Sequence, residues 1–273
     1  MRRGKLLNGL GDLNNLKALE IGPLDRPILS KDEVDVTYVD YTDTETLKQN
    51  YASAPDHDVA KIVNVDAVWG ERTLPDALGE GVLADLVVAS HVIEHVPDVI
   101  TWFQEIGSAL KSHGTVRLAI PDRRYCFDVR RRDSTVAELI YSYILRARKP
   151  LPHQILDFSL NFFAVDVAEA WGGVANIQEV VSESEVNHAI AVAKCVMDSG
   201  EYLDIHCWVF TPLSFSRVMW QLSIAGLINF SCSCWFDTEI NELEFFVVMQ
   251  KCDNKEVNGA SWKAMHDKIA AMT

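Results

Sequence analysis

The chain lacks paired cysteines and long uninterrupted apolar runs. Its six cysteines are scattered among 273 residues with no CxxC pair, which predicts reduced thiols rather than disulfides or a cysteine zinc site. No segment approaches the ~18 uncharged apolar residues of a membrane span. The basic start of the chain has no apolar core of signal-peptide length. We therefore expect a cytoplasmic protein without a membrane span.

Positive charge is also scarce. Lys and Arg together number 25 against 39 Asp and Glu, which gives a formal net charge of −14. Such a surface repels phosphate backbones, so we expect no nucleic-acid partner. An apolar share of 48% is ample for a core. The length suits one large domain with an insertion.

Glycine is missing where a dinucleotide-binding turn would need it. In "KALEIGPLDRPIL" (residues 17–29) an apolar strand leads to Gly22, but Pro-Leu-Asp-Arg follows instead of further glycines. Glycines in such turns make room for a pyrophosphate at a helix N-terminus. Their absence weighs against a nicotinamide-binding site and weighs less against a ligand without phosphates.

Apolar segments alternate with helical patterns in the first half of the chain. We expect strands at residues 18–22, 34–40, 61–67, 84–91 and 115–122. A helix capped by Asp98 should precede the last of them. This alternation predicts a parallel sheet covered on both faces. Ligands of such sheets bind beyond the carboxyl ends of the strands, where Asp40, Asp66, His91 and Asp122 stand.

The alternation is interrupted and then resumes. Residues 123–204 read as a mostly helical insertion over the ligand edge of the sheet. After them come a helix with Thr211 as N-cap and Pro212 at its first position, and two strands at 229–237 and 243–252. The short turn between these strands requires an antiparallel hairpin. We expect one domain over 1–273, with its core at 17–122 and 205–252.

Several segments resemble the class I S-adenosylmethionine-dependent methyltransferases. They are "LEIGPLDRPIL", "YVDYTD", "NVDA", "SHVIEHVPD" and "IPDRRYCFDVRRR", in that family's order and spacing. More narrowly, "IPDRRYCFD" and "HCWVFTPLSF" are similar to methyltransferase-domain proteins encoded with bacterial polysaccharide and glycosyltransferase genes. The resemblance implies a Rossmann-like α/β fold with a mostly parallel seven-stranded sheet, a C-terminal antiparallel hairpin and S-adenosylmethionine as cofactor.

The resemblance assigns cofactor roles to residues at the first two strand ends. Glu20 and Gly22 would form the turn beside the methionine part of the cofactor, and Arg26 would meet its carboxylate. Asp40 would accept hydrogen bonds from both ribose hydroxyls, because two adjacent donors match the two oxygens of a carboxylate. The alternative for a strand-end aspartate is to cap the next helix.

Further roles fall on the next two strand ends. Asp66 and Ala67 would meet the adenine edge. Ser90 and His91 would lie under the sulfonium and the acceptor. Glu94 and His95 read as a hydrogen-bonded pair at the entry of a helix, and a metal bound by them and another carboxylate has only weak support from spacing. We therefore assign no metal site.

Three histidines are candidates for a catalytic base, because the pKa of histidine lies near neutrality. His206, just before the helix that follows the insertion, is the first choice, and His91 is the second. His153 stands four residues before Asp157, which on a helix could orient its ring. For each histidine the alternative is a structural imidazole.

The basic run after the fifth strand is the candidate acceptor site. Arg123 and Arg124 could bind phosphate or carboxylate oxygens, and Tyr125 could offer a surface to a sugar ring. The alternative is a solvated face paired with acids such as Asp128 and Asp133.

The sequence thus predicts methyl transfer to an oxygen of a sugar, glycan or nucleotide-sugar precursor, which could be anionic. Two alternatives stay open. One is a catalytically degenerate binding module of the same fold in glycan assembly, and the other is an NAD-dependent oxidoreductase. The oligomeric state has no signal in the sequence.

Overall fold

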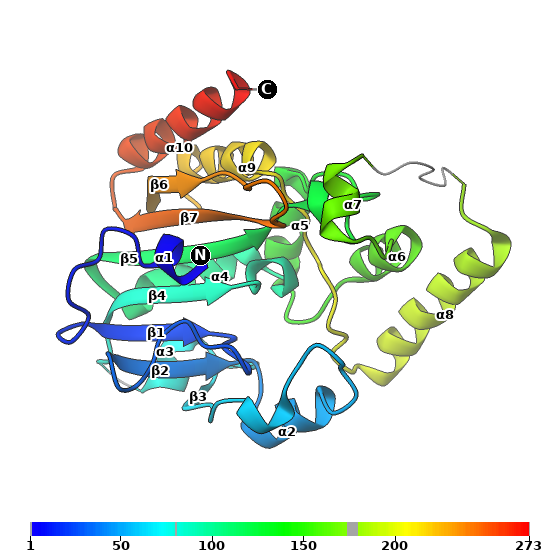
Figure 1. The fold of residues 1–273 in the computed structure, drawn as a ribbon, viewed down its shortest axis with the longest axis horizontal. Coiled ribbons are helices and arrows are strands. Elements are labelled where there is room, and N and C mark those ends of the chain that lie inside the picture. The colour runs from blue at the N-terminus through cyan, green and yellow to red at the C-terminus, as the bar shows by residue number, and fades with distance from the viewer. Residues whose placement is uncertain (1, 80, 174–179, 273) are drawn as a thin grey trace.

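A single mixed sheet organises the molecule in the computed structural model, which describes residues 2–79, 81–173 and 180–272. Its strand order is β3-β2-β1-β4-β5-β7-β6 (Figure 1). The strands are β1 (Lys17–Ile21), β2 (Asp35–Asp40), β3 (Ala67–Val68), β4 (Ala84–Ser90), β5 (Leu110–Pro121), β6 (Phe230–Phe236) and β7 (Glu244–Lys251). β1 to β5 pair in parallel, whereas β7 is antiparallel to both β5 and β6. The expected α/β fold, a mostly parallel seven-stranded sheet ending in an antiparallel hairpin, is confirmed.

The third strand is shorter and later than predicted. Its predicted span was 61–67, but β3 holds only Ala67 and Val68. Residues Val59–Lys61 instead form a 3₁₀ turn, η1, in which the Asp58 side chain accepts a hydrogen bond from the Ala60 amide. A local side-chain bond of this kind competes with strand pairing. Asp66 therefore precedes β3 rather than lying at its carboxyl end.

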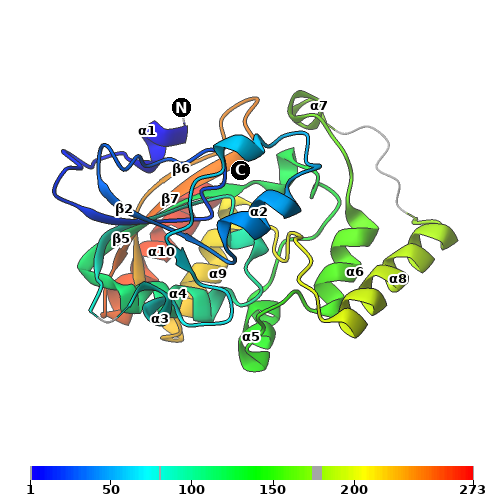
Figure 2. The same cartoon turned by 90° about the horizontal axis from the view of Figure 1, so that it is seen from below.

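Helices cover one face of the sheet. They are α3 (Leu74–Leu78), α4 (Val99–Ala109), α9 (Pro212–Ile224) and α10 (Lys255–Ala270), which lie together beneath the strands in Figure 2. The predicted caps are confirmed: Asp98 accepts from the Thr101 amide at 2.9 Å, and Thr211 caps α9 with Pro212 at its first position. The described residues form two hydrophobic cores, and the larger one lies between the sheet and these helices. Because strand side chains alternate between faces, Leu19 and Ile21 of β1 belong to this larger core.

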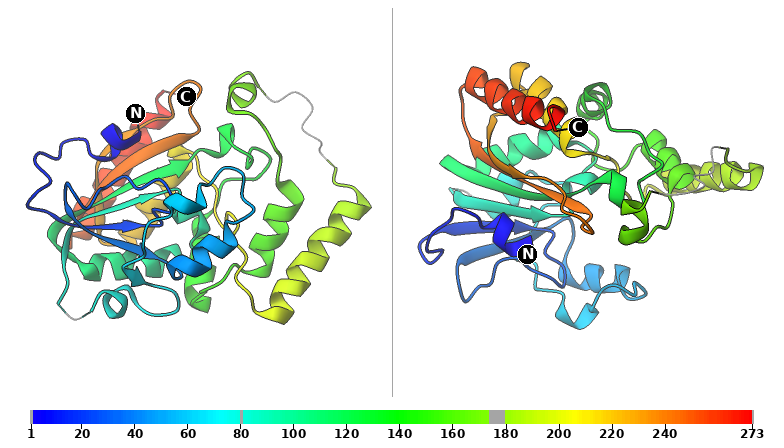
Figure 3. Two further views of the ribbon diagram at one scale, coloured as in Figure 1. Left: turned by 60° about the horizontal axis from the view of Figure 1, so that its bottom comes forward. Right: turned by 45° about the horizontal axis from the view of Figure 1, so that its top comes forward.

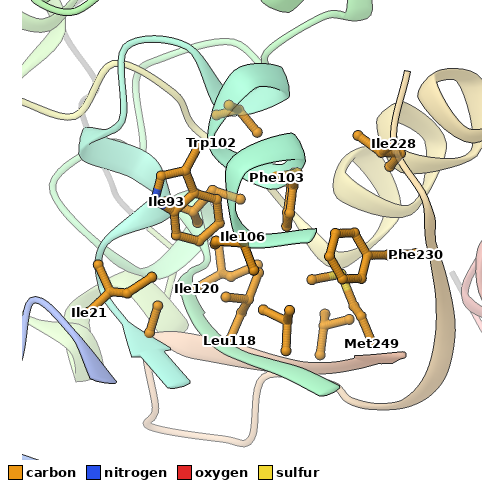
Figure 4. Close-up of a cluster of buried hydrophobic side chains, with 14 of the residues drawn as sticks. Ile21, Ile93, Trp102, Phe103, Ile106, Leu118, Ile120, Ile228, Phe230 and Met249 are labelled. Carbon is orange, nitrogen blue, oxygen red and sulfur yellow. The ribbon is translucent and has the colours of Figure 1, made fainter. Parts of the chain in front are cut away.

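The larger core is aromatic and aliphatic. In Figure 4, Trp102, Phe103 and Ile106 of α4 point toward Leu118 and Ile120 of β5. Phe230 and Met249 of the C-terminal hairpin meet the same cluster. The hairpin is therefore part of the main core and not an appendage to it.

The opposite face is covered by a short helix and by a segment of turns and bends. Helix α1 (Arg2–Leu6) and the segment 22–34 pack there against Val36, Leu86 and Val88. Residues 22–34, all of them described, contain no helix. The connection from β1 to β2 therefore lacks the helix N-terminus on which a dinucleotide pyrophosphate binds.

The insertion is helical in its described residues. It holds η3 (Arg123–Tyr125), α5 (Val136–Leu145), α6 (Pro152–Asn161), α7 (Val167–Trp171) and α8 (Glu183–Ser199), while 174–179 lie outside the described residues. Figure 3 shows α6 and α8 beside each other and standing away from the sheet. Helix α2 (Thr44–Asn50) follows β2, as the sequence indicates. No described helix has the length and apolarity needed to span a membrane.

The terminal helix α10 is not predicted by the sequence analysis. Trp262 at its centre is fully buried and donates its indole N–H to the Phe230 carbonyl at 2.8 Å. We expect Trp262→Ala to lower the free energy of unfolding by about 3–5 kcal/mol, because it leaves a large cavity and an unpaired carbonyl. The control is Val257→Ala at an exposed position of the same helix, with an expected change below about 0.5 kcal/mol. Equal losses in urea titrations of the two variants would contradict this assignment.

Candidate functional site

A cavity of about 560 Å³ lies at the carboxyl edge of the parallel strands. Its wall comes from the turn after β1, the ends of β2 and β4, the start of α4 and both ends of the insertion. The lining residues are Arg2, Glu20–Arg26, Asp40, Tyr41, Tyr51, His57, Trp69, Gly70, Ser90–Val92, His95–Asp98, Thr101, Trp102, Phe127, Ala147, Arg148, Tyr202, Asp204 and His206. The parts of the insertion that line the cavity are its two ends and the connection between α5 and α6, and none of the lining residues belongs to α6, α7 or α8.

The turn after β1 is held by a buried carboxylate. Glu20 accepts hydrogen bonds from the amides of Ile28 and Leu29 at 2.6 and 2.8 Å. Burial raises the pKa of Glu20 to about 7, although these two bonds oppose the rise. Gly22 has a φ of +65°, and a Cβ there would meet Val92 Cγ2 at 2.8 Å. Gly22 is therefore required by conformation and by space, even without further glycines.

Asp40 lines this cavity and has one carboxylate oxygen without a hydrogen-bond partner among the described residues. It ends β2 with 4% of its surface exposed, and its Oδ1 accepts from the Tyr41 amide at 2.8 Å. Its Oδ2 has no hydrogen-bond partner among the described residues. Burial, with a smaller contribution from Asp204, raises the pKa of Asp40 to about 7. Helix α2 is capped by Asp43, so Asp40 does not have the alternative role of a helix cap.

The end of β4 carries a strained histidine. His91 has a φ of +56°, a left-handed conformation that costs free energy in a residue with a side chain. Its amide donates to the Ala119 carbonyl, and its Nε2 lies 2.6 Å from Glu244 Oε2 at the start of β7. Burial alone would raise the pKa of Glu244, but contacts with His91 and Arg2 hold it below its usual value. Ser90 also lines the cavity.

Glu94 lies at the centre of three histidines. It is 1% exposed in η2 (Ile93–His95), and neither carboxylate oxygen has a hydrogen-bond partner among the described residues. Its Oε1 is 3.6 Å from His91 Nδ1, 3.9 Å from His95 Nε2 and 4.0 Å from His206 Nε2. The amides of Cys207 and Trp208 both donate to the Glu94 carbonyl, which brings the 206–208 segment to this centre.

Each histidine also has a carboxylate at its other ring nitrogen. Asp204 lies 2.7 Å from His95 Nδ1, and Asp128 lies 2.5 Å from His206 Nδ1. Burial lowers the pKa of His95, but Asp204 and then Glu94 raise it, and the result is about 9. Since an ionised carboxylate only accepts hydrogen bonds, the nitrogen facing it carries the proton. For His206 this leaves Nε2 directed toward Glu94.

Aromatic rings form the rest of the wall. Tyr41 stacks on Tyr202 with ring centroids 5.1 Å apart, and the Tyr51 hydroxyl donates to Asp204 at 2.9 Å. The Phe127 ring lies 4.6 Å from that of His206. The wall thus offers flat apolar surfaces beside a few charged groups, which is typical of small-molecule sites.

The structure brings together most of the predicted cofactor residues. Glu20, Gly22, Arg26 and Asp40 line this one cavity, as do Ser90, His91 and His206. Arg26 reaches the rim, where it donates to the Asp56 carbonyl at 2.6 Å. Its role toward a methionine carboxylate stays a prediction.

Three other predicted residues lie elsewhere. Asp66 does not line the cavity; its carboxylate accepts from Lys31 and from the Tyr38 amide. Ala67 is buried in β3 away from the cavity. His153 is exposed on α6 against Tyr141, and Asp157, expected to orient it, pairs with Arg131 at 2.7 Å. The late start of β3 explains the corrections for Asp66 and Ala67. Because β3 begins at Ala67, Asp66 lies before the strand and not at its carboxyl end.

The basic run is engaged in local pairs. Arg123 lies 2.5 Å from Asp133, and Arg124 makes a bidentate contact with Asp122. The Tyr125 ring stacks on Trp171 at 3.8 Å. None of the three residues lines the cavity, and both arginines are paired with acids, so their contact with an acceptor stays a prediction.

The sequence analysis missed the connected histidine–carboxylate cluster. Asp128, Asp204 and Glu244 are far apart in sequence and have no pattern that links them. The only local signal is "HVIEH", in which His91, Glu94 and His95 follow at spacings of three and one. On a turn after a strand, that spacing can direct three side chains to one point.

The raised pKa of Asp40 predicts a pH-dependent cost to stability. The folded protein holds the Asp40 proton up to its raised pKa of about 7, whereas the unfolded chain releases it near the ordinary pKa of 3.8. The folded state therefore loses stability as pH rises between these values. We expect Asp40→Asn to stabilise the free protein at pH 8 by about 1–4 kcal/mol, and to give no gain at pH 4. A difference in urea-unfolding free energy that is the same at both pH values would refute this.

Comparison with known proteins gives structural similarity only. No family model and no curated protein matches the chain. The CurJ carbon methyltransferase is 10% identical with a TM-score of 0.41; the match covers 90% of this chain and 51% of that one, so the chain spans about half its length. A SAM-dependent methyltransferase from Methanosarcina mazei is 15% identical, with a TM-score of 0.41 and coverages of 90% and 96%. A provisionally assigned Zn-dependent alcohol dehydrogenase from Rhodobacter sphaeroides is 11% identical, with a TM-score of 0.47 and coverages of 91% and 88%. At these values the similarity carries no functional conclusion for this chain.

Proposed function

We propose that the protein is an S-adenosylmethionine-dependent methyltransferase that acts on an oxygen of a sugar, glycan or nucleotide-sugar precursor. The observation that carries the proposal is that Asp40 lines the cavity and that its buried Oδ2 has no hydrogen-bond partner among the described residues. A buried carboxylate oxygen without a partner is costly, and a ligand with hydroxyl donors would satisfy it. The sequence resemblance assigns the ribose hydroxyls to this residue.

The rest of the cavity fits the same cofactor. Its volume of about 560 Å³ lies within the usual range for sites of this kind. The turn at Gly22 lets backbone approach a ligand closely, and the Tyr41 ring offers a flat surface beside Asp40. The helix-free segment after β1 suits a ligand without phosphates better than a dinucleotide. This disfavours the oxidoreductase alternative.

When bound, the cofactor supplies a methyl group activated by a positively charged sulfur. The chain must then orient an acceptor oxygen and take up its proton. His206 is the first candidate base, because it lines the cavity and Asp128 fixes its ring. His91 is the second, with Glu244 in the equivalent supporting position.

The acceptor proposal rests on the sequence resemblance together with these bases. A hydroxyl acceptor needs a base, and the aromatic wall suits the apolar face of a sugar ring. An anionic acceptor gains no support from the Arg123 and Arg124 pair, since both arginines are bound to acids outside the cavity.

Calorimetric titration with S-adenosylmethionine and S-adenosylhomocysteine tests the cofactor assignment. We expect both to bind, and Asp40→Asn to weaken binding at least about tenfold because it replaces a charge-assisted acceptor. Asp66→Asn is the matched control, since it alters an aspartate outside the cavity and should leave affinity within about twofold.

Two outcomes would contradict the proposal. Absence of heat with either ligand in the unmodified protein would favour the non-catalytic binding module. Binding of NADH in a parallel fluorescence titration, without S-adenosylhomocysteine binding, would favour the oxidoreductase.

A further inference from the structure

The cluster around Glu94 has spacings that hydrogen bonds do not explain. The three histidine nitrogens lie 3.6 to 4.0 Å from Glu94 Oε1, beyond normal hydrogen-bond length. One ligand atom from each of Glu94, His95 and His206 lies within 4.8 Å of the other two. Ligands of one tetrahedral zinc ion, each about 2.0–2.1 Å from it, are about 3.4 Å apart. A movement of up to about 0.7 Å per side chain would bring these atoms from 4.8 Å apart to the separation of ligands on a shared ion.

Burial makes this arrangement costly without a cation. Glu94 is 1% exposed and neither carboxylate oxygen has a described hydrogen-bond partner. Removing a carboxylate from water without such partners costs several kcal/mol as an order of magnitude. A cation at the centre of the cluster would offset that cost, whereas the histidine rings as placed are too distant to donate to the carboxylate.

The outer contacts have the form found around metal-bound histidines. Asp128 is hydrogen-bonded to Nδ1 of His206, and Asp204 lies 2.7 Å from Nδ1 of His95 without hydrogen-bond geometry, so each ring directs its Nε2 inward. Metal-binding histidines commonly donate their other N–H to a carboxylate, which fixes the tautomer and the ring orientation. Asp128 is itself held by Arg131 at 2.9 Å. The two aspartates and Arg131 therefore surround the candidate ligand atoms of the cluster.

We propose that Glu94, His95 and His206 form a binding site for a divalent transition-metal ion of the zinc class. Two imidazoles and a carboxylate favour Zn²⁺, Fe²⁺ or Co²⁺ over Mg²⁺, which prefers oxygen ligands. Three protein ligands leave a coordination position for a water or another ligand. The site shares His206 with the methyl-transfer proposal, since a metal ion on its Nε2 would prevent that nitrogen from acting as the base and would leave the role to His91.

The test is metal binding by the full chain without cofactor. Protein stripped with a chelator and dialysed against Zn²⁺ is analysed for bound metal, and Co²⁺ is added separately as a probe with visible absorption. We expect about one Zn²⁺ per chain, tetrahedral-type Co²⁺ bands, and a higher melting temperature with Zn²⁺ because the ion binds only the folded state.

Variants identify the ligands. Glu94→Gln and His206→Ala should each weaken Zn²⁺ binding at least about 100-fold, since even outer partners of a metal site contribute about 10–100-fold. His153→Ala, an exposed histidine on α6, is the control and should bind Zn²⁺ as the unmodified chain does. Circular dichroism verifies folding, and the zinc-induced rise in melting temperature, lost only in the first two variants, is the second readout.

Three results would overturn the proposal. They are no stoichiometric Zn²⁺ in the unmodified chain, Zn²⁺ binding that survives in both folded ligand variants, and stabilisation by Mg²⁺ but not by Zn²⁺. Titration of S-adenosylhomocysteine in the presence of chelator is scored separately. Failure of the metal site and failure of the cofactor site are thus distinguishable.

Discussion

Parallel pairing of β1 with β2 and β4 is the constraint on which the candidate site depends. Parallel strands end at one edge, so the chain turns after β1, β2 and β4 open side by side. The strand order reverses between β1 and β4, where Gly22 leaves one strand and His91 leaves the other. The backbone hydrogen bonds of the sheet fix these strand ends beside one another, and side chains distant in sequence therefore meet there.

Several ionisable side chains are buried at this carboxyl edge of the parallel strands. Glu20, Asp40 and Glu94 are nearly inaccessible, and burial raises the pKa of the first two to about 7. The protein retains them against a cost in stability, which the extensive core of the α3, α4, α9 and α10 face offsets. Such a concentration of costly groups at one edge of a sheet is characteristic of functional sites. Asp40 Oδ2 and both carboxylate oxygens of Glu94 have no hydrogen-bond partner among the described residues.

The sequence predicted the architecture better than the side-chain partners. Periodicity, the Asp98 and Thr211 caps and the short hairpin turn are local signals, and each was confirmed. The third strand was misplaced because a local cap in η1 competed with strand pairing, and Asp66 moved out of the site with it. The partners of the histidines could not be predicted, since Asp128, Asp204 and Glu244 reach them only through long-range packing. The basic run was ambiguous for a different reason, because its acids are close in sequence and a local ion pair gives the same pattern as a ligand site.

A crystal structure with S-adenosylhomocysteine is the most direct measurement of the central claim, that the Asp40 edge holds an adenosyl ligand. The account predicts that both ribose hydroxyls lie within hydrogen-bond distance of the Asp40 carboxylate. It also predicts that the ligand sulfur lies on the side of His91 and His206. Density for the ligand at another part of the surface, or an Asp40 carboxylate that remains without a partner in the complex, would contradict it.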